Sequence, residues 1–147
     1  MQPNQKISEG IAVLATIDPV LQGIGTVSTG WISVANMLQI LALVDVGVFG
    51  ASATVDANIV QATDNIGTGS KAITGKSIVQ MLAAGGNNKQ VLINLRPTDL
   101  DTTNNFNFVR LNVVVAAAAT QVSAAVVAVP RYEDASLLNQ AGVTQVI

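Results

Sequence analysis

Residues 39–49 read QILALVDVGVF and carry the strongest strand signal in the chain. The even-numbered residues from 40 to 48 are all apolar, and the odd-numbered ones from 41 to 49 are apolar except Asp45 and Gly47. Successive side chains of a strand point to opposite faces, so both faces of such a strand would be largely apolar. We therefore expect a central strand that is covered on both sides. A helix over residues 34–43, where Ala and Leu are frequent, is the alternative.

Further short apolar stretches on either side, separated by Gly, Asn or Pro, predict the rest of a mainly β domain. Residues 54–64 alternate apolar and polar side chains and predict an outer strand with one solvated face. Residues 108–117 and 121–129 are rich in Val and Ala, and we expect them to pair as a hairpin. The other expected pieces are strands at 11–17, 31–34 and 90–95, short strands or helices at 71–74 and 77–82, and a loop or 3₁₀ turn at 98–107.

These pieces amount to roughly seven to nine short strands, which is typical of an antiparallel β-sandwich or a jelly-roll-like barrel. We expect at most one or two short helices. The predicted organisation is an N-terminal arm at residues 1–10, a β-sandwich domain at 11–132 and a C-terminal arm at 133–147. The second arm carries apolar side chains, and we expect these to be buried on a neighbour or on the chain's own core.

The composition excludes several classes of function. Of the 147 residues 50% are hydrophobic and only 11% charged, the formal net charge is −2, and there is neither His nor Cys. A chain with no basic excess is a poor nucleic-acid binder, and one without imidazole or thiol lacks the commonest catalytic bases and metal ligands. We expect no enzymatic activity, no cofactor and no metal. Because soluble monomers usually carry more surface charge, we also expect a homo-oligomer.

Two stretches imitate membrane spans. Residues 37–49 are too short to cross a bilayer, and residues 111–129 are interrupted by Thr120, Gln121 and Ser123. We interpret both as strands, and we expect neither a membrane partner nor a signal peptide at the start of the sequence.

Three features invite a chemical interpretation. Residues 70–77 end in Gly-Lys-Ser, but they lack the first glycine and the strand–helix context of a phosphate-binding loop, so we reject nucleotide binding. Asp99 and Asp101 could share a metal or act as an acid–base pair, but we expect loop capping instead. Asp45 sits in the apolar strand, where a buried carboxylate must find a partner. Arg96 or Arg110 could supply it, or Asp45 could face a subunit boundary.

Large side chains are rare in this sequence, and such residues anchor interfaces disproportionately often. Trp31 and Tyr132 could alternatively close the two ends of the sandwich. The candidate interface residues are Trp31, Asp45, Arg131, Tyr132, Leu137 and Leu138.

Five short segments carry a resemblance to a known class of protein. They are VDANIVQATD at 55–64, GTGSKAI at 67–73, NKQ at 88–90, DLD at 99–101 and PRY at 130–132. Together they resemble small virion structural proteins of tailed bacteriophages and prophages, from the head and tail assembly region. The resemblance carries over no binding residue.

The resemblance implies a non-enzymatic decoration or cement protein on an icosahedral phage head, made in the bacterial cytoplasm. Its implied partners are the major capsid protein and further copies of itself, with no nucleic acid and no small-molecule substrate. A tail-tube, head–tail connector or fibre-base subunit remains an alternative, and so does a small ligand-binding β-barrel.

Overall fold

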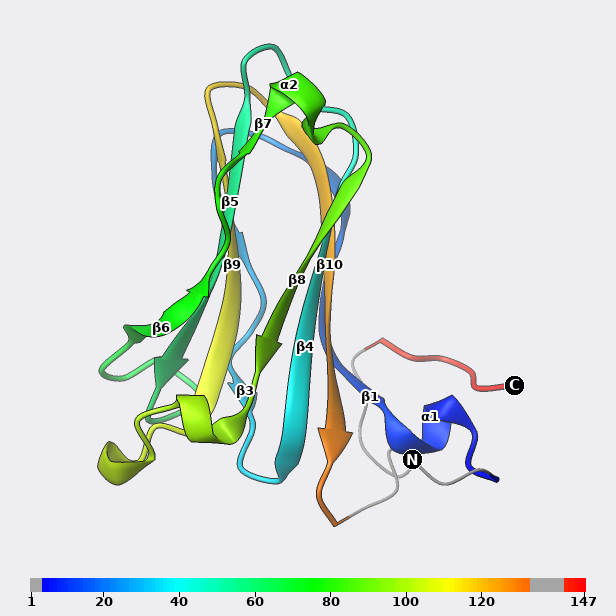
Figure 1. Cartoon of the computed structure of the whole chain (residues 1–147), viewed down its shortest axis with the longest axis vertical. Helices are drawn as coiled ribbons and strands as arrows, with labels where there is room; N and C mark the ends of the chain where they lie inside the picture. Colours follow the sequence, from blue (N-terminus) through cyan, green and yellow to red (C-terminus); the bar gives the residue numbers. More distant parts are fainter. Residues whose placement is uncertain (1–3, 133–141) are drawn as a thin grey trace.

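Two antiparallel β-sheets packed face to face form the body of the molecule (Figure 1). They are seen in a computed structural model, which describes residues 4–132 and 142–147. The four-stranded sheet has the order β1 (Ala12–Gln22), β10 (Thr120–Pro130), β4 (Met37–Val46) and β8 (Lys89–Leu95). The six-stranded sheet has the order β2 (Gly25–Ser28), β9 (Phe108–Ala116), β5 (Thr54–Ala62) and β6 (Lys71–Ser77), with β3 (Ile32–Ser33) on β9 and β7 (Met81–Leu82) on β5.

The helical pieces in the described part of the chain are short. They are α1 (Ile7–Gly10), α2 (Ala83–Gly86) and the 3₁₀ turns η1 (Pro97–Asp99) and η2 (Thr102–Asn104). The expected mainly β fold with one or two short helices is confirmed.

The strand pairings are nested like those of one long hairpin. Its tip lies between β5 and β6, and moving outward β4 pairs with β8, β2 with β9 and β1 with β10. Consecutive pairs fall in opposite sheets, so the hairpin is rolled into a two-layer barrel. This connectivity is the jelly-roll topology.

The core fills the space between the sheets and consists of small aliphatic side chains. In β4 the even-numbered residues point inward, and Ala42, Val44 and Val46 are fully buried. In β9 the odd-numbered residues do the same, with Leu111 at the centre. Branched side chains pack densely on a pleated surface, which explains how so few aromatic residues suffice.

Two sequence-based predictions about these elements were wrong, and one stated alternative is excluded. Residues 108–117 and 121–129 do not form a hairpin: β9 pairs with β5, β2 and β3, whereas β10 pairs with β1 and β4 in the other sheet. Residues 34–43 hold the start of strand β4, so the strand predicted at 39–49 is confirmed and the alternative helix is excluded. Residues 54–64 contain β5, which is an interior strand between β9 and β6.

Strand β1 is longer than predicted because it runs through Pro19. It lies at the edge of its sheet, and its register with β10 is broken between Ile17 and Val20. An edge strand tolerates proline where no ladder hydrogen bond is needed. The two stretches that imitate membrane spans contain β4, β9 and β10, and no helix within the described residues is long and apolar enough to cross a membrane.

Candidate interaction surface

Strand β4 is apolar on both faces, but the described chain covers only one of them. Its inward residues are fully buried, whereas Leu43 on the outward face is 36% exposed and Asp45 is exposed. Within the described residues, the expectation that both faces are covered is therefore wrong. No second sheet covers the outward face of this sheet among the described residues. Figure 1 shows α1 and the C-terminal segment beside its lower end, where Glu9 and Gly10 line a hollow together with Gln39 and Val129.

Apolar side chains occupy three of the four strands in each of two neighbouring rows of this outward face, and the remaining positions are Thr16 on β1 and Asn94 on β8. Leu43 lies between Ala125 of β10 and Leu92 of β8, and Leu92 is 59% exposed. In the neighbouring row Leu41 lies between Val127 and Asn94. We call the apolar residues of these two rows the apolar strip. Its members are Val13, Leu41, Leu43, Leu92, Ala125 and Val127.

The outward face of the six-stranded sheet is polar instead. The Ser28 hydroxyl donates to Asn112 Oδ1 at 2.7 Å, and Gln80 Nε2 donates to Asp56 Oδ2 at 2.7 Å. Asn58 lies directly opposite Asn112 on the paired strand. These side chains satisfy one another or face water. Val60 and Val114 share this face with them, so among the described residues the outward face of the six-stranded sheet is mixed but more polar than the strip of the four-stranded sheet.

Asp45 borders the apolar strip and corrects another prediction. Its carboxylate is exposed and accepts a hydrogen bond from Gln90 Nε2 at 2.8 Å. The ion pair with Arg96 or Arg110, one of the two alternatives, is therefore absent, and a place for Asp45 at a subunit boundary stays a prediction. Alternation along β4 places Asp45 on the outward face, where its carboxylate stays in water and no charge is buried. The charged side chain also ends the apolar strip on this side.

Trp31 forms a local cluster at the edge of the six-stranded sheet. The Arg110 guanidinium lies 4.7 Å from the centroid of its ring, and the ring packs directly on Gly67. A Cβ atom on Gly67 would come within 2.6 Å of the indole Nε1, and Gly67 has a φ of +90°. Both the conformation and the close contact require glycine there. The structure thus uses Trp31 to close a loop, while its predicted interface role remains untested.

Arg131 and Tyr132 follow directly after β10. The Arg131 backbone N–H donates to Asn36 O, and its guanidinium lies 5.8 Å from the Tyr132 ring centroid. Tyr132 is 79% exposed, so it does not close the end of the sandwich. The other two candidates, Leu137 and Leu138, lie outside the described residues.

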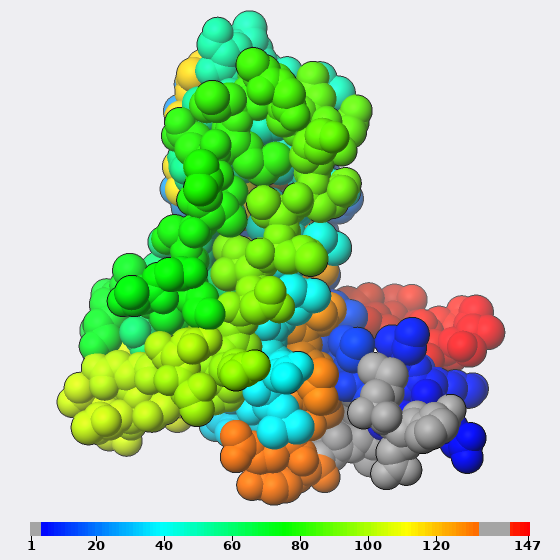
Figure 2. Space-filling model, viewed as in Figure 1, coloured from blue at the N-terminus to red at the C-terminus, as the bar shows by residue number. Residues whose placement is uncertain are grey.

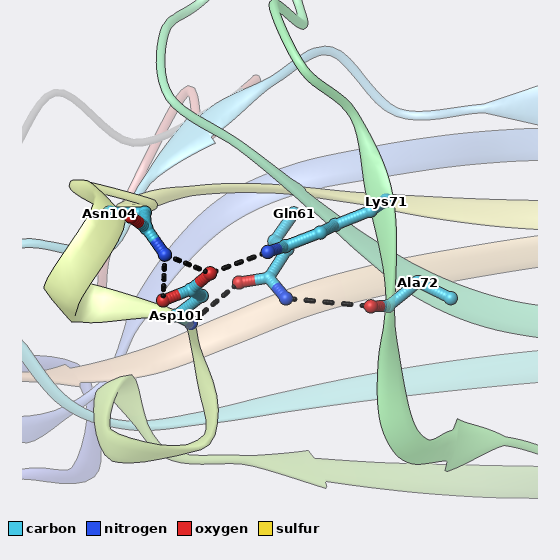
Figure 3. Close-up of polar contacts among 5 residues, drawn as sticks. All are labelled: Gln61, Lys71, Ala72, Asp101 and Asn104. Atoms are coloured by element: carbon cyan, nitrogen blue, oxygen red, sulfur yellow. Dashed lines mark hydrogen bonds and ion pairs between the residues drawn. The ribbon is translucent and has the colours of Figure 1, made fainter.

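A polar network holds the β8–β9 connection against β5 and β6 (Figure 3). Gln61, which is 5% exposed, accepts a hydrogen bond from the Asp101 backbone N–H at 2.8 Å and donates to Ala72 O at 3.4 Å. Lys71 forms an ion pair with the Asp101 carboxylate, and Asn104 Nδ2 donates to both of its oxygens. The predicted structural role of Asp101 in its loop agrees with these contacts.

The pKa values of the loop carboxylates follow from these bonds. The pKa of Asp101 is lowered mainly by its hydrogen bond with Lys71 and then by Asn104. The pKa of Asp99 is lowered first by the Arg96 backbone N–H and then by Lys76, whose Nζ lies 3.0 Å from Asp99 Oδ2. The Gly-Lys-Ser sequence that ends at Ser77 thus belongs to strand β6, and its lysine pairs with a carboxylate.

One surface hollow of about 420 Å³ lies beneath the β8–β9 connection. Leu100 and Phe106 provide apolar walls, and Asn107 and Arg131 provide polar ones. The Asn107 Oδ1 atom is buried without a hydrogen-bond partner. Within the described residues no group of three or more acidic, His or Cys side chains could hold a metal ion.

The apolar strip was not among the predicted interface residues. Its signal is present in the sequence, because residues 41 and 43 are outward and apolar, and Leu92 alternates with Gln90 and Asn94. What sequence reasoning missed is that residues 4–132 and 142–147 place a second sheet on only one side of this sheet. That depends on where the helices and the other sheet lie in three dimensions.

No protein-family model matches the sequence, and no curated protein is similar to it. Solved structures with a similar fold include the SPBc2 prophage-derived protein YomS, at 11% identity and a TM-score of 0.44, over 80% of this chain and 92% of that one. A Broad Bean Stain Virus structure matches at 8% identity and a TM-score of 0.49, over 100% of this chain and 96% of that one. A Cowpea Mosaic Virus empty particle matches at 8% identity and a TM-score of 0.44, over 80% of this chain and 78% of that one. We take no functional argument from similarities of this size.

Proposed function

We propose that this chain is a non-enzymatic structural protein of a tailed-bacteriophage virion, a decoration or cement protein that binds the icosahedral head. The observation that carries the proposal is the apolar strip, an outward sheet face with Leu43 and Leu92 exposed. A monomeric sandwich normally makes its solvent-facing side polar, and the outward face of the six-stranded sheet is the more polar of the two here. An apolar outer face is typical of a subunit that is covered by a neighbour.

The sequence resemblance supplies the type of particle, and the charge of the chain fits it. With a formal net charge of −2, many copies can lie side by side with little mutual repulsion. A shell is held by contacts repeated through symmetry, so each subunit needs interface area more than a pocket. In the proposed complex the apolar strip lies on the major capsid protein.

The first test measures copy number. Quantitative mass spectrometry of purified particles should find this chain in hundreds of copies, in a fixed ratio to the major capsid protein. A count of about six to twelve would instead identify a ring-shaped connector or tail component, because such rings have closed cyclic symmetry. Absence from the particles would refute the proposal.

The second test places a charge on the apolar strip. Leu43→Asp adds a carboxylate at a partly exposed site, so the fold should survive while retention on the particles falls at least tenfold. Thr26→Asp adds the same charge to the exposed outer face of the six-stranded sheet and is the matched control. Equal retention of both variants would rule out the strip as the docking surface.

A further inference from the structure

The four-stranded sheet has one edge that is unprotected, and that edge is β8. All seven residues of β8 pair with β4 without a register shift, and β4 is its sole strand partner among the described residues. It contains no proline and no bulge, and its one charged side chain, Lys89, is at its start. In Figure 2 the yellow-green surface of residues 89–95 is uncovered on the face toward the viewer.

The other sheet edges carry the devices that usually prevent strand addition. β1 contains Pro19 and two register shifts. β6 has a register shift opposite β5, a glycine at φ +74° and two lysines. β2 and β3 are four and two residues long. A seven-residue edge that has no proline, bulge or glycine and carries its single lysine at one end is a ready template for another strand.

The sequence of β8 is complementary to itself in the antiparallel direction. A two-fold axis through Leu92 would place Leu92 against its own copy, Gln90 against Asn94 and Val91 against Ile93. The outward face then pairs leucine with leucine and amide with amide, and the inward face pairs two branched aliphatic residues. No like charges meet within residues 89–95, since Lys89 would face Leu95.

We propose that two copies of this chain pair through their β8 edges, antiparallel about Leu92, and join their four-stranded sheets into one eight-stranded sheet. The pairing gives hydrogen-bond partners to the free backbone groups along both β8 edges, and these main-chain hydrogen bonds supply the affinity. The matching of side chains across the two strands selects the partner. The two apolar strips then become one continuous surface. This inference rests on the proposed function, because it describes how copies assemble before they bind the particle.

A cysteine scan tests the register directly, because the chain contains no Cys. Paired residues in antiparallel strands have Cα atoms about 4.5 to 5.5 Å apart, within the range of about 4.4 to 6.8 Å that a disulfide accepts. Leu92→Cys should therefore give a disulfide-linked dimer under mild oxidation. Leu82→Cys, at a site of similar exposure (52% against 59%), is the control for random collision and should remain monomeric on a denaturing gel.

Two further variants fix the alignment. Gln90→Cys and Asn94→Cys should each crosslink poorly alone and efficiently when mixed, because residue 90 of one copy faces residue 94 of the other. Leu43→Cys should not crosslink, since the two β4 strands would lie about 14 Å apart across three strand spacings. If Gln90→Cys links to itself as fast as the mixture does, the proposed register is wrong.

A charge variant provides an independent measurement. Leu92→Lys would place two ammonium groups opposite each other, and sedimentation velocity should show at least a tenfold rise in the dissociation constant of the dimer. Leu82→Lys should leave it unchanged. The edge pairing would be overturned if Leu92→Lys formed oligomers as the original chain does. It would also be overturned if Leu92→Cys formed oligomers but no disulfide-linked dimer. The proposed function has a separate readout, the presence of the chain on particles, so the two failures are distinguishable.

Discussion

The buried amide of Gln61 offers the sharpest test of what holds the β8–β9 connection in place. Gln61→Met keeps the length of the side chain but removes the acceptor for the Asp101 N–H and the donor to Ala72 O. Each lost hydrogen bond costs about 1 kcal/mol, so we expect a loss of about 2 kcal/mol in the free energy of unfolding. With a urea m-value of about 2 kcal/mol/M for a chain of this size, the midpoint should fall by about 1 M.

Urea unfolding followed by the fluorescence of the single tryptophan measures this directly. The Gln80→Met variant is the matched control, because Gln80 is exposed and its bond to Asp56 lies on the surface. Its free energy of unfolding, obtained from the midpoint through the same m-value, should change by less than about 0.5 kcal/mol. Runs at two protein concentrations separate dissociation of oligomers from unfolding.

Two results would refute the reasoning about Gln61. One is a Gln61→Met midpoint equal to that of Gln80→Met, which would mean that the buried amide contributes nothing net. The other is a changed m-value, which would mean that the substitution alters the compactness of one state instead of removing two bonds.

The remaining predictions concern packing, backbone conformation and pH. Leu111→Ala, at 1% exposure in the centre of β9, should lower the free energy of unfolding by about 2 to 5 kcal/mol, measured by urea titration. Gly67→Ala should destabilise more than Gly75→Ala, because both have positive φ but only the former meets the tryptophan ring; equal thermal midpoints would contradict this. Because the pKa values of Asp99 and Asp101 are lowered in the folded state, their stabilisation is present above the ordinary carboxyl pKa and is lost as pH falls through the folded values. The urea midpoint should therefore fall as the pH drops below about 4, the ordinary carboxyl pKa, and Asp101→Asn should weaken that dependence.

Local patterns in the sequence were sufficient to predict most of the strands, although β2 (Gly25–Ser28) was not among them. The alternation in residues 39–49 and 90–95 reports the two-residue period of a strand, which needs no knowledge of the rest of the chain. The same is true of the 3₁₀ turns after Arg96, because Pro97 and the capping aspartates act within a few residues. Strand content and the sandwich class were therefore predictable.

Pairing was not predictable in the same way. β9 and β10 are adjacent in sequence and both rich in Val or Ala, but they lie in opposite sheets. Ala117, with a φ of +67°, begins the crossing between the sheets, and nothing local distinguishes this turn from that of a hairpin. The partner of each strand is set by the nested long-range register, which only the packed core selects.

The same distinction applies to the candidate surface. The sequence by itself determined that β4 has two apolar faces and that the chain has too few charges for an ordinary solvated exterior. Only the tertiary structure decided which face is buried in the chain, where Asp45 points and that Leu43 and Leu92 meet on an open side. The physical reason is that alternation fixes the two sets of side chains, whereas the position of the second sheet determines which set is covered.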